Sequence, residues 1–180
     1  MTREVRVVPY DNNWPNLFQQ EVTRISNVLW REIVSVHHIG STSIPGMSAK
    51  PIIDILLEVK DISEIDNYNN EMIALGYEPR GELGIPGRRY FSREELKDVR
   101  THHVHTYQTD NIELERHLAF RDYMITHPDD VQVYSELKMV LARRFQWYID
   151  GYISGKHLYM ERMEKVAIEW YRSRDSYVNS

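Results

Sequence analysis

Residues that could bind a phosphate and a metal ion gather in the segment 37–59 (HHIGSTSIPGMSAKPIIDILLEV). Gly40 ends a predicted strand, where the missing side chain lets the backbone approach a ligand closely. Ser41 offers a hydroxyl and an N–H to a phosphate oxygen, and a short helix starting near it would add further N–H donors. Twelve residues separate Ser41 from Asp54. Mg²⁺ is commonly bound by a carboxylate and by phosphate oxygens at the same time. The segment therefore predicts a phosphate site beside a divalent cation.

The same residues also allow a structural interpretation, in which Gly40-Ser41 is a turn and Asp54 is a buried carboxylate held by backbone donors. The position two residues after Asp54 is Leu56, and the next carboxylate, Glu58, lies about 13 Å further along a regular strand. Two carboxylates so far apart do not chelate one ion easily. A metal at Asp54 therefore needs another ligand from elsewhere in the chain.

A second dense group is the segment 101–107 (THHVHTY), which alternates like a strand. His103 and His105 face the same side, about 7 Å apart, and His102 faces the other. Two imidazoles on one face can ligate a transition metal, bind a phosphate when protonated or transfer protons; the alternative is a polar strand face with ordinary hydrogen bonds. The chain contains no cysteine, so a zinc site would need carboxylate or further histidine ligands.

Basic side chains elsewhere could supply the positive charge that a phosphate requires. Arg88-Arg89 open a predicted strand, where one of them faces the sheet surface that carries the other candidates. A solvated hairpin is the alternative for both arginines. The further basic candidates are single residues on predicted loops and helices: Lys50, Arg121, Lys138 and Lys156.

The elements that must position these side chains are predicted to be a mixed sheet in about 1–109 and helices in about 110–175, together one α/β (α+β) domain over 1–180. Strands are predicted at 5–8, 34–39, 51–59 and 101–107, with a hairpin in 77–92 around GELGIPG. Helices are predicted from Trp14 to Leu29 and at 63–75 (capped by Ser63), 111–126, 129–149 and 155–173, with Pro128 and Gly151 at the joints.

The composition is that of a globular protein with a mildly acidic surface. The formal net charge of −5 argues against nonspecific binding to nucleic acid, which depends on basic surface. No run approaches the roughly 20 apolar residues that a membrane span needs. The first residues carry charges where a signal peptide would be apolar, so the cytoplasm is the expected location.

Taken together, the pieces resemble the GrpB family, a branch of the DNA polymerase beta-like nucleotidyltransferase superfamily that also occurs fused to dephospho-CoA kinase in some bacteria. The resemblance rests on an ordered set of segments: VVPYDNNWPNLFQQE, HIGSTSIPGMSAKPIIDILLEV, GYEPRGELGIPGRRYF, HHVH, HLAFRDYMITHPDDVQVYSELK and a late GK. It implies a nucleotidyltransferase-like mixed sheet flanked by helices. The pocket residues that it implies are Gly40, Ser41, Lys50, Asp54, Arg89, His103, His105, Arg121, Lys138 and Lys156. Leu56 at the second acidic position departs from the superfamily pattern but is typical of this branch.

Three functions follow as alternatives. The first is transfer of a nucleotidyl or phosphoryl group to a small molecule, with Mg²⁺ or Mn²⁺ held by Asp54 and completed by His103 or His105. The second is a binding protein that keeps a pocket for a nucleotide or CoA-like ligand after its metal clamp has decayed. The third is a metal-dependent hydrolase built on the histidine strand. In each the partner is a small phosphorylated or metal-bound molecule, and the sequence does not indicate the oligomeric state.

Overall fold

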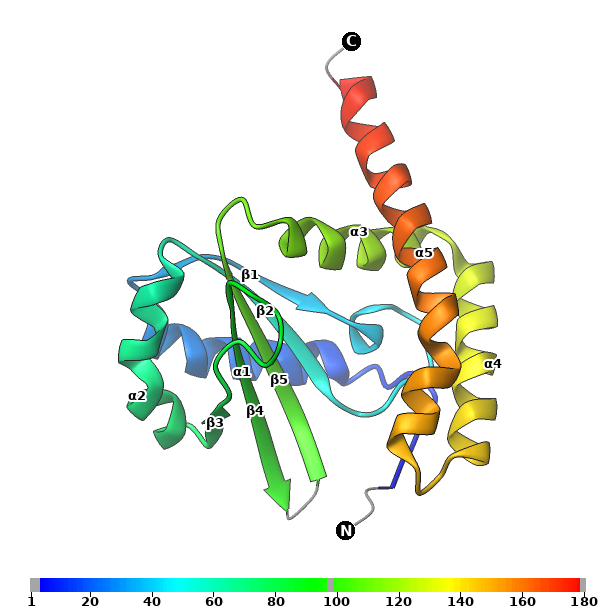
Figure 1. Cartoon of the computed structure of the whole chain (residues 1–180), viewed down its shortest axis with the longest axis horizontal. Helices are drawn as coiled ribbons and strands as arrows, with labels where there is room; N and C mark the ends of the chain where they lie inside the picture. Colours follow the sequence, from blue (N-terminus) through cyan, green and yellow to red (C-terminus); the bar gives the residue numbers. More distant parts are fainter. Residues whose placement is uncertain (1–3, 97–98, 179–180) are drawn as a thin grey trace.

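A five-stranded mixed sheet covered by helices forms the protein (Figure 1). The computed structural model describes residues 4–96 and 99–178, with side chains as far as residue 174. The strands are β1 (Ile33–Ile39), β2 (Ile53–Val59), β3 (Tyr77–Pro79), β4 (Arg88–Leu96) and β5 (Val99–Gln108). The α-helices are α1 (Trp14–Leu29), α2 (Asn69–Ala74), α3 (Ile112–Thr126), α4 (Pro128–Arg144) and α5 (Ile149–Val178), and two 3₁₀ segments are η1 (Ser41–Ser43) and η2 (Ile62–Tyr68). The expected α/β class with a helical last third is confirmed.

The strands lie in the order β1-β2-β5-β4-β3, and only the β2–β5 pair is parallel. β2 is covered on both faces, as its nearly continuous apolar sequence predicts. Its odd-numbered side chains pack against Ile25 and Leu29 of α1. On the other face, Leu56 packs with Tyr107 of β5 and Leu114 of α3. The candidate site lies on this second face, under the C-terminal helices.

The register between β2 and β5 positions the two dense groups of the sequence. Asp54 pairs with His103, and Leu56 pairs with His105. Because side chains alternate along a strand, Asp54, His103 and His105 share one face of the sheet. Sequence periodicity predicts each strand but not this register, which is fixed by the fold.

The helical third packs through small residues. Gly151 and Gly155 lie inside α5, where a Cβ at Gly151 would stand 2.6 Å from the rings of Phe145 and Tyr148, and one at Gly155 would stand 2.5 Å from a methyl of Leu141. Both glycines therefore allow α5 to approach the end of α4 closely. The prediction that Gly151 marks a joint before a helix starting at 155 is wrong.

The segment 5–8 is not a strand, contrary to its alternating pattern. Val8 makes an isolated antiparallel bridge to Ala49, and the backbone N–H of Val5 donates to the carbonyl of Gln146 at 2.7 Å. These contacts hold the segment between the sheet edge and the end of α4. Residues 1–3, which bear on the expectation about a signal peptide, lie outside the described range.

The predicted helix at 63–75 is divided into η2 and α2. Its cap is Asp61, whose carboxylate accepts the backbone N–H of Ser63 at 2.8 Å, so the assignment of Ser63 as the cap is corrected. The hairpin around GELGIPG is confirmed, since β3 and β4 pair antiparallel. Within the described ranges, no helix has both the length and the apolar character needed to cross a membrane.

Candidate metal and phosphate site

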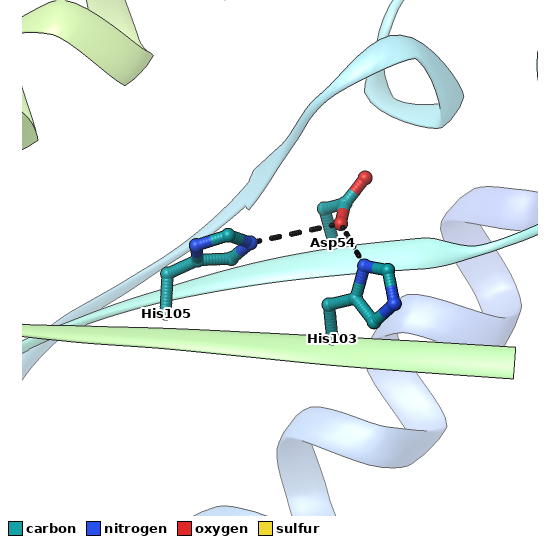
Figure 2. Close-up of side chains that lie close together, drawn as sticks. All are labelled: Asp54, His103 and His105. Atoms are coloured by element: carbon teal, nitrogen blue, oxygen red, sulfur yellow. Dashed lines mark hydrogen bonds and ion pairs between the residues drawn. The ribbon is translucent and has the colours of Figure 1, made fainter. Parts of the chain in front are cut away.

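Asp54, His103 and His105 meet in one cluster on the helix-covered face of the sheet (Figure 2). The Nδ1–H of His103 donates to Oδ1 of Asp54 at 3.0 Å, and Nε2 of His105 lies 3.7 Å from the same oxygen. One ligand atom from each residue can be chosen so that all three lie within 4.8 Å of one another. Figure 2 shows both imidazoles extending from β5 towards the same carboxylate oxygen from different directions. Asp54 and the histidines do meet in space, which the sequence left open.

The surroundings of the cluster keep the carboxylate charged and the imidazole of His105 neutral. Burial by itself raises the pKa of Asp54, but hydrogen bonds to His103 and His105 outweigh it and hold that pKa below the usual value. Burial lowers the pKa of His105, opposed by the charge of Asp54. Among the described residues, the buried Nε2 of His103 and Nδ1 of His105 have no hydrogen-bond partner. A carboxylate oxygen beside two imidazoles is a donor set that suits a divalent cation.

Gly40 is required by the position of Asp54. Its φ of +69° and ψ of −173° fall in a region that side chains rarely adopt. A Cβ at this position would stand 2.5 Å from Oδ2 of Asp54. The glycine therefore lets the turn after β1 lie directly against the carboxylate, as predicted for the Gly40-Ser41 pair. The short helix expected after it is the single 3₁₀ turn η1.

Lys138 of α4 reaches into the same region, although nothing near it in the sequence indicates this. Its side chain is only 2% exposed, and its Nζ donates to Oγ of Ser41 at 2.9 Å and lies 4.4 Å from the centre of the Tyr134 ring. Burial, followed by repulsion from Lys156 and Lys50, lowers the pKa of Lys138 to about 7. A buried ammonium held by a hydroxyl and a ring, without a carboxylate in contact, is suited to receive an anion.

Lys50 and Lys156 both lie close to Tyr152, with Nζ 5.6 Å and 5.5 Å from its ring centre. Burial lowers the pKa of Lys156, while the charges of Asp54 and Glu164 oppose this. Together with Lys138 these residues line a cavity of about 160 Å³, which we call the lysine lobe. The lysine lobe is lined by Ser41, Thr42, Ala49, Lys50, Ile52, Asp54, His103, Lys138, Tyr152 and Lys156.

A second cavity of about 220 Å³ adjoins Asp54 and is called the aromatic lobe. It is lined by Ile39, Gly40, Ser41, Asp54, His105, Arg116, His117, Phe120, Tyr134, Lys156, Met160 and Glu164. The two lobes share Ser41, Asp54 and Lys156. A larger hollow of about 510 Å³ between residues 4–7 and α4 contains none of these groups, so size alone does not locate the chemistry.

Two of the predicted basic residues are engaged elsewhere. Arg89 pairs in register with Thr106, on the sheet face opposite His105, and forms a bidentate ion pair with Asp66 at 2.7 and 2.8 Å. Arg121 contacts the carboxylate of Asp122 and the carbonyl of residue 38. The structure therefore does not bring Arg89 into the site and uses Arg121 to brace the end of β1.

Three residues that the structure brings to the site were not among the predicted site residues. The ring centre of Tyr90 lies 5.1 Å from that of His105, and the ring centre of His117 lies 5.3 Å from that of His105. Burial, followed by the charges of His105 and Arg116, keeps the pKa of His117 well below its usual value. Arg116 occupies the wall next to it. A signal existed for His117, which follows Glu113 by one helical turn, but that spacing fits a solvated helix face equally well.

The comparison with known proteins gives a clear result at the level of the family. The model described as GrpB protein matches residues 4–166, nearly the whole chain. This chain belongs to the GrpB family. The expected resemblance to that family is thereby confirmed.

Relatives in the GrpB family support the assignment. The chain is 44% identical to UPF0157 protein YqkA of Bacillus subtilis, over 97% of this chain and 50% of that protein. It is 36% identical to UPF0157 protein PA4798 of Pseudomonas aeruginosa, over 84% of this chain and 63% of that one. The chain thus spans only about half to two-thirds of these two relatives.

A solved structure resembles the fold closely. The crystal structure of conserved protein GrpB from Enterococcus faecalis superimposes with a TM-score of 0.89 and 41% identity, covering 92% of this chain and 99% of that chain. The arrangement of sheet and C-terminal helices is therefore shared with that protein.

Proposed function

We propose that this GrpB-family protein binds a phosphorylated small molecule together with a divalent metal ion and transfers a nucleotidyl or phosphoryl group from it. One observation carries the proposal: Asp54 and His103 of the metal-ligating cluster and the Ser41–Lys138 pair line the same cavity, the lysine lobe. A metal-ligating cluster next to ammonium groups is the arrangement that a metal-bound phosphate needs. A nucleotide is the ligand class that the family resemblance favours.

The residues present fit a metal ion, and they favour Mn²⁺ over Mg²⁺. Mg²⁺ prefers oxygen ligands, whereas imidazole nitrogens suit transition metals. The cluster offers one carboxylate and two imidazoles, since Leu56 provides no second carboxylate and is fully buried. The ring nitrogens that face the carboxylate oxygen are Nδ1 of His103, at 3.0 Å, and Nε2 of His105, at 3.7 Å, so these two atoms would hold the ion together with Asp54. When bound, the ion neutralises phosphate charge.

The remaining steps belong to side chains of the chain itself. Lys138 and Lys156 balance the charge of a phosphate, and the hydroxyl of Ser41, which accepts from Lys138, can donate its own proton to the phosphate. Gly40 allows the backbone to approach. These residues hold the phosphate beside Asp54 and exclude water from one side of it. Transfer then requires a nucleophile on the open side.

Hydrolysis of a phosphate ester is the second candidate, because three protein ligands with an open position are also typical of catalytic metal sites that activate water. The two candidates differ in where the phosphoryl or nucleotidyl group goes. In hydrolysis the product carries an oxygen from water, whereas in transfer it carries the acceptor. Incubation in ¹⁸O-labelled water followed by mass spectrometry separates them.

Metal binding is tested first, by titrating the purified, metal-stripped protein with Mn²⁺ and measuring free Mn²⁺ by electron paramagnetic resonance. Asp54→Asn and His103→Gln are expected to weaken binding by tenfold or more, roughly 1.4 kcal/mol. His157→Gln is the matched control, since His157 lies on α5 with a side chain 65% exposed, away from the cluster. Equal affinity in all four proteins would disprove the metal site.

Phosphate binding and turnover are tested next. Calorimetry with ATP and Mn²⁺ is expected to show saturable binding that Lys138→Met weakens, and Lys165→Met, at an exposed position of α5, leaves unchanged. Labelled nucleoside triphosphates are then incubated with Mn²⁺ and a metabolite panel. Binding without turnover would favour a pure binding function; turnover that persists in Asp54→Asn would refute the proposed site.

A further inference from the structure

The two lobes beside Asp54 differ in chemistry. The lysine lobe contains three ammonium groups and one carboxylate. The aromatic lobe is walled by Ile39, Phe120, Tyr134 and Met160. The rest of its lining is mostly polar, but its two carboxylates, Asp54 and Glu164, are balanced by Arg116 and Lys156, so the lobe has no net formal charge. Apolar walls with a few polar groups are typical of the part of a pocket that holds an uncharged organic group.

The charged residues of the aromatic lobe neutralise one another. Arg116 donates to Glu113 at 2.8 Å and to Glu164 at 2.7 Å, so its guanidinium is already matched by two carboxylates. A ligand phosphate would have to break these contacts and would meet the negative charge of Glu164. An anionic ligand therefore prefers the lysine lobe, and the aromatic lobe suits a molecule without net charge.

The lobes also reach the Asp54 carboxylate from different sides. His103 lines the lysine lobe and His105 lines the aromatic lobe, and the two imidazoles reach the same oxygen of Asp54 from different directions (Figure 2). Phosphoryl and nucleotidyl transfer needs the entering oxygen to approach phosphorus from the side away from the leaving oxygen. Because the lobes share Ser41, Asp54 and Lys156, a phosphorus atom held beside Asp54 in the lysine lobe has the aromatic lobe next to it as a place for the entering molecule.

We propose that the aromatic lobe is the acceptor subsite, which takes a second, uncharged small molecule with an apolar or flat ring and a hydroxyl group. This inference rests on the proposed transfer function. In the transfer, the acceptor oxygen forms a bond to phosphorus and the bond from phosphorus to the bridging oxygen breaks. With a nucleoside triphosphate as donor, the leaving group is pyrophosphate in nucleotidyl transfer or the nucleoside diphosphate in phosphoryl transfer, and it takes up the proton of the hydroxyl group.

The competing occupant of the aromatic lobe is the base or sugar of the phosphorylated ligand itself. The two occupants predict different behaviour. An acceptor subsite binds a neutral molecule and the metal–nucleotide complex at the same time, whereas a base subsite makes the two compete.

The experiment uses the full chain with ¹³C-methyl methionine, in which Met160 is one of seven methionines and is assigned with Met160→Leu. Benzyl alcohol, phenol and cyclohexanol are titrated with and without ATP and Mn²⁺, and benzoate is the charged comparison. At least one alcohol is expected to shift the Met160 methyl resonance saturably in both conditions, and benzoate is expected to bind more weakly. No shift with any alcohol, or loss of the shift when ATP and Mn²⁺ are added, would overturn the inference.

A second variant separates the two lobes. Met160→Trp fills the aromatic lobe and removes the reporter methyl group, so both probes are measured in it and in the wild type by calorimetry. The alcohol is expected to bind about tenfold more weakly while sulfate, the probe of the lysine lobe, keeps its affinity within about twofold. Equal loss of both probes would show that the lobes are one site and would overturn the inference. Normal alcohol binding in a protein that binds neither Mn²⁺ nor sulfate would refute the proposed function but leave this neutral subsite in place.

Discussion

Replacing Lys138 by methionine removes a buried ammonium whose pKa is lowered from 10.5 to about 7. At 1.36 kcal/mol per pKa unit, this difference corresponds to about 5 kcal/mol of free energy that disfavours the charged form in the folded state. The side chain is 2% exposed, so solvent screening reduces this figure little. The groups that face the ammonium are Ser41, the Tyr134 ring and the more distant Lys50 and Lys156. None of them is a carboxylate, which explains why the pKa of Lys138 is lowered so far.

The sign of the pH dependence follows from where the proton is held. Below about pH 7, Lys138 is charged in both the folded and the unfolded protein, and the folded state carries the full cost of burying the charge. Between about pH 7 and pH 10.5 the unfolded protein keeps a proton that the folded protein has lost, so this group makes the free energy of unfolding rise with pH. Lys138→Met lacks this rise. The stability of the variant minus that of the wild type should therefore fall by about 2.5 kcal/mol from about pH 7 to about pH 9.

Urea unfolding followed by circular dichroism at several pH values measures this difference directly. Subtracting the wild-type curve cancels the titrations that both proteins share. The control Lys165→Met tests whether replacing an exposed lysine gives the same pH dependence of stability. Sulfate keeps its charge over this range, so its binding provides a second readout. Its affinity should fall above about pH 7 in the wild type and change less in Lys138→Met, because the protonated ammonium binds the anion. A stability difference that does not change with pH would refute the assignment of Lys138 as a buried, uncompensated cation.

The remaining predictions concern the turn, the excluded arginine and the metal. Gly40→Ala should lose about 1–3 kcal/mol of stability and most Mn²⁺ affinity, since its methyl group displaces Asp54. Gly84 also has a positive φ but has open space around it, so Gly84→Ala should lose stability alone. Urea unfolding and Mn²⁺ titration measure the two effects. Arg89→Ala should leave sulfate affinity unchanged in calorimetry and cost at most about 1 kcal/mol for its partly exposed pair with Asp66; weaker sulfate binding would place Arg89 back in the site. Mn²⁺ at a hundredfold excess over its dissociation constant should stabilise the protein by about 2.7 kcal/mol in urea unfolding, and no stabilisation would contradict specific binding to the folded state.

The parts of the site that lie on β2 and β5 could be predicted from the sequence because their chemistry is local. The Gly40-Ser41 turn, the carboxylate of Asp54 and the two same-face histidines each form a recognisable pattern within a few residues. These patterns do not specify which residues of two neighbouring strands lie opposite one another. The parallel pairing that places His103 opposite Asp54 depends on the whole sheet, and no local pattern encodes it.

The helical side of the site was identified only through the family resemblance, for a physical reason. A lysine on an amphipathic helix usually points to solvent, and the sequence around Lys138 and Lys156 offers no contrary signal. Their burial follows from the close approach of α5 to α4, which Gly155 permits. Glycine in a helical pattern indicates a break as readily as a tight contact, so the same residue type that brings the lysines together made the helix boundary at Gly151 difficult to predict.

The position of Leu56 can be reinterpreted from the strand register. A carboxylate two residues after Asp54 would lie on the same strand face and complete an all-oxygen clamp. Leu56 instead pairs with His105 across the β2–β5 ladder and is buried against Tyr107 and Leu114. In the proposed metal site, His105 would therefore supply, from the neighbouring strand, a ligand at the level where the second carboxylate is missing. The substitution changes the chemistry of the clamp from oxygen-rich to mixed nitrogen and oxygen, and the expected consequence is a preference for Mn²⁺ over Mg²⁺ instead of the loss of metal binding.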